Sequence, residues 1–205
     1  TSGNANSFTF SHTTGAGANG LLLVGVALRT TGSTASGITY GGRALTSVGD
    51  VDSNTTHMEI WAMTSPPSGA NDVVVTLDGT SQAAIGATTF FGVDQTTPLG
   101  TFVSARGYFG SPSVTVSSAP GQVVFDTMAS KNTNPASADS GQTQLWQDST
   151  QSQVTGGSSM APGAASVTMT WSVGGTARWA IGAVPIRPAI SAPAATFTQA
   201  PAFAL

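Results

Sequence analysis

The side chains best suited to chemistry are few. His57 and Glu59 stand two residues apart in a stretch that alternates in polarity, so a β-strand would place both on one face. A histidine beside a carboxylate suits acid–base catalysis, but a hydrolase also needs an activated nucleophile, and the chain has no cysteine and no G-x-S-x-G motif. His12 is the only other histidine, and Asp126 is the one aspartate we retain as a candidate for glycoside hydrolysis. We predict that the protein is not an enzyme.

A second group of polar residues resembles the start of a calcium-binding loop. Asp50, Asp52 and Asn54 follow the pattern D-x-D-x-N. The sixth position, however, is Thr55 where such a loop needs glycine, and the twelfth is Trp61 where it needs glutamate. We therefore favour an acidic turn between strands, and we predict neither a metal nor a cofactor.

Aromatic side chains raise the possibility of sugar binding, because their faces stack on the apolar faces of sugar rings. The aromatic residues considered for such a platform are Trp61, Trp146, Trp171, Trp179, Tyr40 and Tyr108. Each tryptophan stands among core-type residues, which favours a place in the core or in a subunit contact.

Composition limits the remaining classes of function. Charged residues make up 7% of the 205 residues, against roughly 25% in an average soluble domain. The net charge is −3, with only six Lys and Arg residues and no basic cluster, which argues against nucleic-acid binding. The longest apolar run, Leu21 to Leu28, is too short to cross a membrane. The start at Thr1 and the lysine-poor, Ser/Thr/Gly-rich composition favour a secreted protein at the cell surface.

The elements that must position these residues are strands, because Gly or Pro interrupts the chain often and no helical periodicity is sustained. The predicted strands are Ser7–Phe10, Leu21–Arg29, Gly37–Tyr40, Ala44–Val48, His57–Met63, Asp72–Leu77, Ala83–Val93, Gly100–Ala105, Ser113–Ser117, Gln122–Ala129, Gln144–Asp148, Gln151–Ser159, Ala165–Val173 and Arg178–Ile186. This spacing predicts an all-β, antiparallel two-sheet sandwich of about a dozen strands, with jelly-roll topology. Two tandem immunoglobulin-like domains, joined near 98–110, rank second.

Several phrases together resemble a known family. They are LLLVGV, ITYGGRALT, EIW followed by PPSG, FFGVDQTTPLG and WAIGAVPIRP, in that order. Together they are similar to a β-sandwich module of secreted and surface-anchored bacterial proteins, over about residues 8–188. The resemblance implies an extracellular domain with structural or adhesive roles and supplies no catalytic residues. It also implies that residues 189–205 lie outside the module.

Those last residues read AISAPAATFTQAPAFAL and alternate with a period of two. One face would carry the residues that we predict as a subunit interface, namely Phe197, Gln199, Pro201, Phe203 and Leu205. We divide the chain into a sandwich domain, residues 1–188, and an extended terminal strand, residues 189–205, that seeks a groove or a sheet edge. Ser7–Phe10 is a second candidate donor strand, ranked lower because it lies inside the resemblance.

The sequence thus favours the subunit of an extracellular bacterial filament. Each copy would insert its terminal strand into the next, so that the protein's main partner is itself. A monomeric adhesin or carbohydrate-binding module of a surface protein is the alternative. In a third interpretation the chain is part of a larger surface protein and the tail is a linker.

Overall fold

A computed structural model describes residues 1–29, 32–132, 134–149 and 153–189. These residues form fifteen β-strands and no helix, and every pairing between strands is antiparallel. The all-β, antiparallel prediction is therefore confirmed. The predicted interface residues Phe197 to Leu205 lie outside the described residues.

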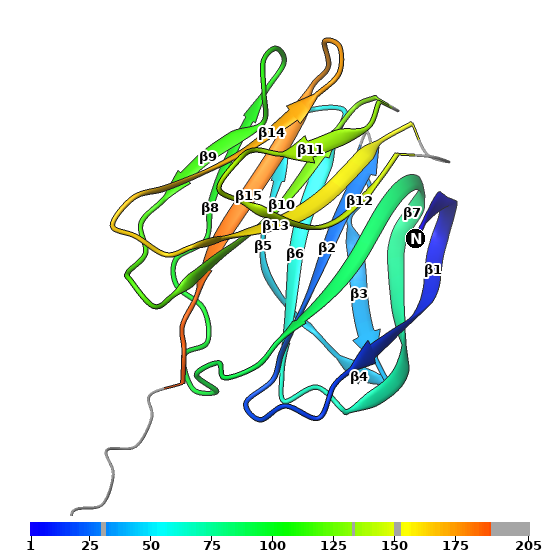
Figure 1. Ribbon diagram of the computed structural model, residues 1–205. Coiled ribbons are helices and arrows are strands. Elements are labelled where there is room, and N and C mark those ends of the chain that lie inside the picture. Colours follow the sequence, from blue (N-terminus) through cyan, green and yellow to red (C-terminus); the bar gives the residue numbers. More distant parts are fainter. Residues whose placement is uncertain (30–31, 133, 150–152, 190–205) are drawn as a thin grey trace, which may run out of the picture.

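The strands form three sheets (Figure 1). The barrel sheet contains β1 (Ser2–Thr14), β2 (Leu21–Arg29), β3 (Ala35–Tyr40), β4 (Arg43–Ala44), β5 (Thr46–Asp52), β6 (His57–Thr64) and β7 (Gly69–Phe90). The middle sheet has the order β12 (Thr143–Asp148), β13 (Thr155–Pro162), β10 (Val123–Ser130), β15 (Trp179–Ile186) and β8 (Val103–Gly107). The outer sheet has the order β11 (Ala136–Ala138), β14 (Val167–Val173) and β9 (Ser113–Val116).

The barrel sheet curls until it nearly closes. β7 is 22 residues long and arches over, so that its first half pairs with β3 and its second half with β2 (Figure 1). β1 follows the arch along both halves, with a register shift between Ala5 and Ser7. On the other side β4 pairs with β3, and β5, which follows after Leu45, pairs with β6. The curl surrounds a core that includes Val24, Val26 and Tyr40.

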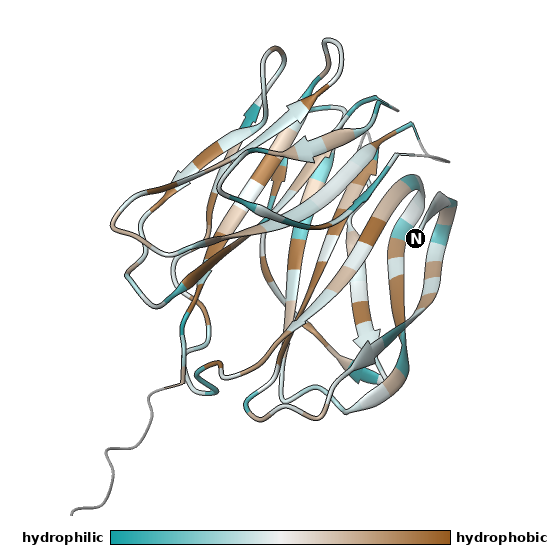
Figure 2. Cartoon of the chain, in the orientation of Figure 1, coloured by the Kyte–Doolittle hydropathy of each residue, from teal (hydrophilic) through white to brown (hydrophobic). Residues whose placement is uncertain are grey.

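The three sheets share two further cores because side chains alternate along each strand. In β2, Leu22, Val24, Val26 and Leu28 point into the barrel, whereas Leu21, Leu23 and Ala27 meet the middle sheet. The middle sheet alternates likewise and turns its opposite face to the outer sheet. Figure 2 shows the resulting bands of hydrophobic residues along the inner strands. The prediction that Leu21–Arg29 is buried on both faces is confirmed.

Other details differ from the sequence-based expectation. The layers comprise three sheets, so the predicted two-sheet sandwich and jelly roll are not confirmed. The described strands also number more than the expected dozen, partly because β11 lies between the predicted strands Gln122–Ala129 and Gln144–Asp148, where no strand was predicted. A hairpin turns at Gly41–Gly42, between the predicted strands Gly37–Tyr40 and Ala44–Val48: Tyr40 pairs with Arg43, and the two glycines have φ of +55° and +78°. Positive φ at both central residues is typical of a type I′ turn.

Candidate functional site

His57 and Glu59 lie together on β6, on the face that turns into the barrel. Both residues are buried, and the His57 Nε2 atom lies 3.2 Å from Glu59 Oε1 and 3.8 Å from Asp50 Oδ2. The contact with Glu59 has the length of a hydrogen bond but not its alignment, so we treat it as a contact between charges. Burial lowers the pKa of His57, but Glu59, Asp50 and Asp52 outweigh burial and raise that pKa above its ordinary value.

The Glu59 carboxylate has a structural task that explains its burial. Oε1 accepts a hydrogen bond from the Ala35 backbone N–H at 2.7 Å, and Oε2 accepts one from Trp61 Nε1 at 2.6 Å. Glu59 therefore ties β6 to the start of β3, although these two strands do not pair. Among the hydrogen bonds of the described residues, none joins a hydroxyl to the His57 ring. The prediction that His57 and Glu59 share one face of a strand is confirmed.

The calcium candidates form the turn between β5 and β6. Asp52 accepts a hydrogen bond from the Asn54 backbone N–H, and Asn54 adopts a left-handed conformation with φ of +70°. The Ser53 N–H closes the turn by donating to the Thr56 carbonyl at 2.9 Å. Asp50 lies two residues before Asp52 on β5, and its Oδ2 atom is the one that lies 3.8 Å from His57 Nε2. Over the described ranges, no group of three or more His, Asp or Glu side chains is placed to hold a metal ion.

Asp126 is fully buried on β10, between the middle and outer sheets. Its Oδ1 accepts hydrogen bonds from the Ser159 backbone N–H at 2.7 Å and from Ser159 Oγ at 2.8 Å, and its Oδ2 accepts one from Trp171 Nε1 at 2.8 Å. Complete burial raises the pKa of Asp126 to about 7, against the lowering effect of these donors. These donors come from β13 and β14, so Asp126 links the middle sheet to the outer sheet.

Five of the six aromatic residues considered for sugar binding lie wholly or partly inside the domain. Trp171, Trp179 and Tyr40 are buried, Trp61 packs against the barrel core, and the half-buried Trp146 lies against Gly86. The interpretation of Trp171 and Trp179 as core residues is confirmed.

The exposed aromatic pair is Tyr108 and Phe109, at the turn between β8 and β9, with exposed fractions of 48% and 68%. The Arg178 guanidinium lies 5.0 Å from the centre of the Tyr108 ring. The Phe109 carbonyl accepts a hydrogen bond from Trp179 Nε1 at 3.1 Å, which fixes the turn. We call this turn, residues 107–110, the aromatic tip.

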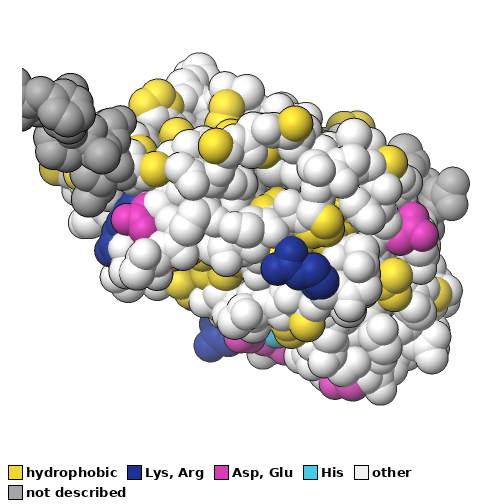
Figure 3. Space-filling model, turned by 90° about the horizontal axis from the view of Figure 1, so that it is seen from below, with side chains coloured by type: hydrophobic (Ala, Val, Ile, Leu, Met, Phe, Trp, Pro, Cys, Tyr) yellow, Lys and Arg dark blue, Asp and Glu magenta, His cyan; other side chains and the backbone are white. Residues whose placement is uncertain are grey.

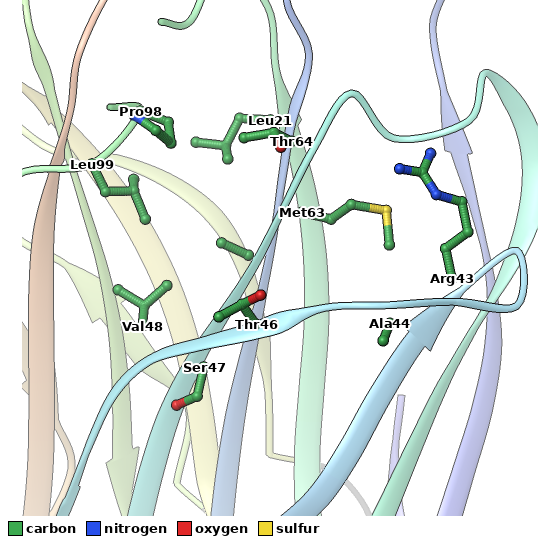
Figure 4. A pocket seen from close by; sticks show the side chains of 11 residues that line it. Leu21, Arg43, Ala44, Thr46, Ser47, Val48, Met63, Thr64, Pro98 and Leu99 are labelled. Atoms are coloured by element: carbon green, nitrogen blue, oxygen red, sulfur yellow. The ribbon is translucent and has the colours of Figure 1, made fainter. Parts of the chain in front are cut away.

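A groove opens at the opposite end of the domain, where the barrel sheet fails to close. β5 pairs with β6 only as far as Ala62, and beyond it Met63 and Thr64 pair with β2 alone. The hollow there has a volume of about 410 Å³. Figure 4 shows Arg43 at one end of it, Met63 in the middle, and Pro98 and Leu99 at the other end. We call this hollow the base groove.

The described chain ends beside the base groove. Ile186, the last residue of β15, bridges to Leu99, and the Arg187 N–H donates to the Pro98 carbonyl at 2.8 Å. Ala189 is fixed by a hydrogen bond of 2.7 Å from its N–H to the Gly92 carbonyl. The predicted tail therefore starts from a firmly held point at the base of the domain.

The comparisons with known proteins leave the family open. No protein-family model matches the chain, and no curated protein and no solved structure matches it either. In the described part of the chain, no helix is long and apolar enough to span a membrane. The function proposed below therefore rests on the sequence and on the geometry of the described domain.

Proposed function

We propose that the protein is a non-enzymatic structural subunit, and that its copies join head-to-tail into an extracellular fibre through residues 190–205. The observation that carries the proposal is the position of β15. This strand lies inside the middle sheet, with β10 on one side and β8 on the other. β15 therefore has a partner strand on each side, and we propose that the neutral, apolar residues after it serve a neighbouring copy.

The ends of β15 separate the donor from a possible acceptor. Trp179, at its start, pairs with Gly107 of the aromatic tip, and Ile186, at its end, bridges to Leu99 at the base (Figure 1). A strand of eight residues spans about 26 Å at about 3.3 Å per residue. A donor at the base and an acceptor on another surface of the domain make a head-to-tail contact, which can repeat from copy to copy.

The free energy of burial, compared with the cost of ordering the tail, favours a sheet edge over the base groove as the acceptor. Burying Phe197, Phe203 and Leu205 would contribute roughly 4–9 kcal/mol. Ordering the nine residues from 197 to 205 costs roughly 1–2 kcal/mol each, which is at least as much. Main-chain hydrogen bonds must supply the difference, and only an unpaired strand edge offers them in series. β8 has such an edge, because no described strand pairs with it on the side away from β15.

The scarcity of charge supports association between copies. Figure 3 shows a face of the domain on which charged side chains are few and scattered among uncharged atoms. Contacts between such faces require the desolvation of few ions, which lowers the cost of packing many copies together.

The first experiment compares the full chain with a chain that ends at Ala189, by electron microscopy and size-exclusion chromatography. We expect fibres or large oligomers from the full chain and monomers from the shortened one. Both chains should show the same β-sheet circular dichroism. If the full chain stays monomeric at every concentration tested, the proposed function is wrong.

A second experiment locates the acceptor by disulfide cross-linking. Because the chain has no native cysteine, only the introduced cysteines can form a cross-link. Phe203→Cys is combined with Ser104→Cys on the β8 edge, or with Ala44→Cys beside the base groove. After oxidation, we expect the first pair to give a ladder of covalent oligomers on a non-reducing gel. A cross-link confined to monomers or dimers in the second pair would instead show that the tail occupies the base groove.

The aromatic tip supports the alternative function, that of an adhesin. Tyr108, Phe109 and the nearby Arg178 offer an exposed stacking surface and a hydrogen-bond donor, which suits a sugar ring. Binding of the monomeric Ala189-terminated chain to a glycan array, lost on Phe109→Ser, would favour this alternative.

A further inference from the structure

A second hollow lies at the far end of β2 from the base groove. Leu21, the first residue of β2, lines the base groove, whereas Arg29, the last residue, lines this second hollow. Its volume is about 290 Å³. Its lining is polar, and includes Asn4, Arg29, Thr55, Thr80, Gln82 and Lys131. We call it the Arg29 hollow.

The charged side chains that line the Arg29 hollow are all of one sign. The lining holds two of the six Lys and Arg residues of the chain and no carboxylate. Neither Arg29 nor Lys131 forms an ion pair with any described residue. In a protein of net charge −3, this is a local concentration of positive charge rather than part of a basic surface.

The aspartates nearest to the lining residues in sequence accept hydrogen bonds from the backbone of neighbouring turns. Asp52 accepts the backbone N–H of Asn54. Asp78 accepts the backbone N–H of Thr34 at 2.9 Å and the Thr34 hydroxyl at 3.1 Å. The undescribed segments 30–31, which follow Arg29, and 150–152 contain only Thr, Gln and Ser and so bring no carboxylate.

Hydrogen-bond donors remain available in the hollow. Among the described residues, the Arg29 guanidinium has one long contact, 3.4 Å from Nη1 to Gln82 Oε1, and that oxygen also accepts the Gln153 N–H at 3.1 Å. The Thr55 hydroxyl is buried and has no hydrogen-bond partner among the described residues. A buried hydroxyl without a partner costs about 1–3 kcal/mol, which a bound acceptor would recover.

We propose that the Arg29 hollow binds an oxyanion, with Arg29 and Lys131 supplying the charge and Thr55 a hydroxyl donor. The shared chemistry is that of a sulfate, phosphate or carboxylate group, because planar guanidinium donors and an ammonium match oxygen acceptors of that kind. Such a group is either a free inorganic anion or the acidic substituent of a polysaccharide. The site is independent of residues 190–205 and of the proposed fibre.

The test measures binding of sodium sulfate to the full chain by isothermal titration calorimetry and by melting temperature. Sodium chloride at equal ionic strength is the reference, and heparin and polygalacturonate are compared with neutral dextran. The variants are Arg29→Gln, Lys131→Gln and Thr55→Val. Arg43→Gln is the matched control, because it removes the same charge beside the base groove.

We expect sulfate, but not chloride, to raise the melting temperature of the native chain and of Arg43→Gln. Arg29→Gln and Lys131→Gln should each weaken binding by about tenfold, the loss expected for one charge-assisted hydrogen bond. Thr55→Val should also bind less well while being no less stable without sulfate, which a merely structural role would not produce. Tighter binding of the acidic polymers, with the same dependence on Arg29, would identify a glycan as the source. Equal responses to sulfate and chloride, or equal binding by Arg29→Gln and Arg43→Gln, would overturn the proposal.

Discussion

Asp126 gives the sharpest test of how this domain is stabilised, because two opposing effects act on one carboxyl group. Burial between the sheets raises its pKa from 3.8 to about 7, although Ser159 and Trp171 donate three hydrogen bonds to it. The folded state therefore binds the proton more tightly than the unfolded state. The contribution of Asp126 to stability is then fully present below about pH 4 and is lost as the pH rises through about 7.

The shift corresponds to roughly three pH units, and thus to about 4 kcal/mol at 1.36 kcal/mol per unit. Asp126→Asn keeps the shape of the side chain but cannot titrate. Its amide –NH2 faces either the Trp171 or the Ser159 donors, which adds a penalty that does not vary with pH.

Urea denaturation of both proteins at pH 4, 5, 6, 7 and 8 measures the effect. The free energy of unfolding of the native protein, minus that of Asp126→Asn, should fall by about 4 kcal/mol across this range. All other titrating groups, His57 included, are common to both proteins and cancel. A difference that stays constant to within about 1 kcal/mol would refute the reasoning. It would mean that the three donors keep Asp126 ionised despite its burial.

Three further changes test other parts of the fold by the same assay. Gly86→Ala would place a Cβ 2.3 Å from the Trp146 ring, so we expect a loss of about 1–3 kcal/mol, and an unchanged midpoint would contradict this packing. Gly42→Ala has open space but a φ of +78°, so about 1–2 kcal/mol should be lost through the backbone alone. His57→Gln should remove a stabilisation that is present below pH 6.5 and is lost as the pH rises through the raised pKa of His57; equal pH profiles would exclude a role for its charge contact with Glu59.

The positions of many strands along the chain could be predicted from the sequence because the alternation of side chains is a local property. Leu21–Arg29 and the two faces of β6 follow directly from residue type and spacing. The predicted separation of the strands Asp72–Leu77 and Ala83–Val93 was wrong, since β7 continues through Asp78 and Gly79. Turn-forming residues there bend the strand rather than end it, because β1 pairs with β7 on both sides of the bend. Local composition carries no information on such a distant partner.

The candidate sites were less accessible to sequence reasoning. Asp126 could be placed on a strand, but its partners lie 33 and 45 residues further along the chain, at Ser159 and Trp171. The base groove arises from the incomplete closure of a curled sheet, which no single segment encodes. The Arg29 hollow likewise joins residues as distant as Asn4 and Lys131. Only the exposed tip had a local clue, the aromatic pair Tyr108 and Phe109 followed by Gly110 and a proline.

Glycines allow the barrel sheet to pack closely against the middle sheet. This close packing explains how a domain with so few charged residues is stabilised. A Cβ on Gly25 would lie 2.5 Å from Thr127 Oγ1, and one on Gly156 would lie 2.6 Å from the Ala27 Cβ. The sheets can approach this closely only where side chains are missing, and close approach increases dispersion contacts on both faces. Because these contacts lie wholly within the described domain, we expect the chain ending at Ala189 to stay folded. Any loss of assembly on truncation would then report on the tail rather than on the stability of the domain.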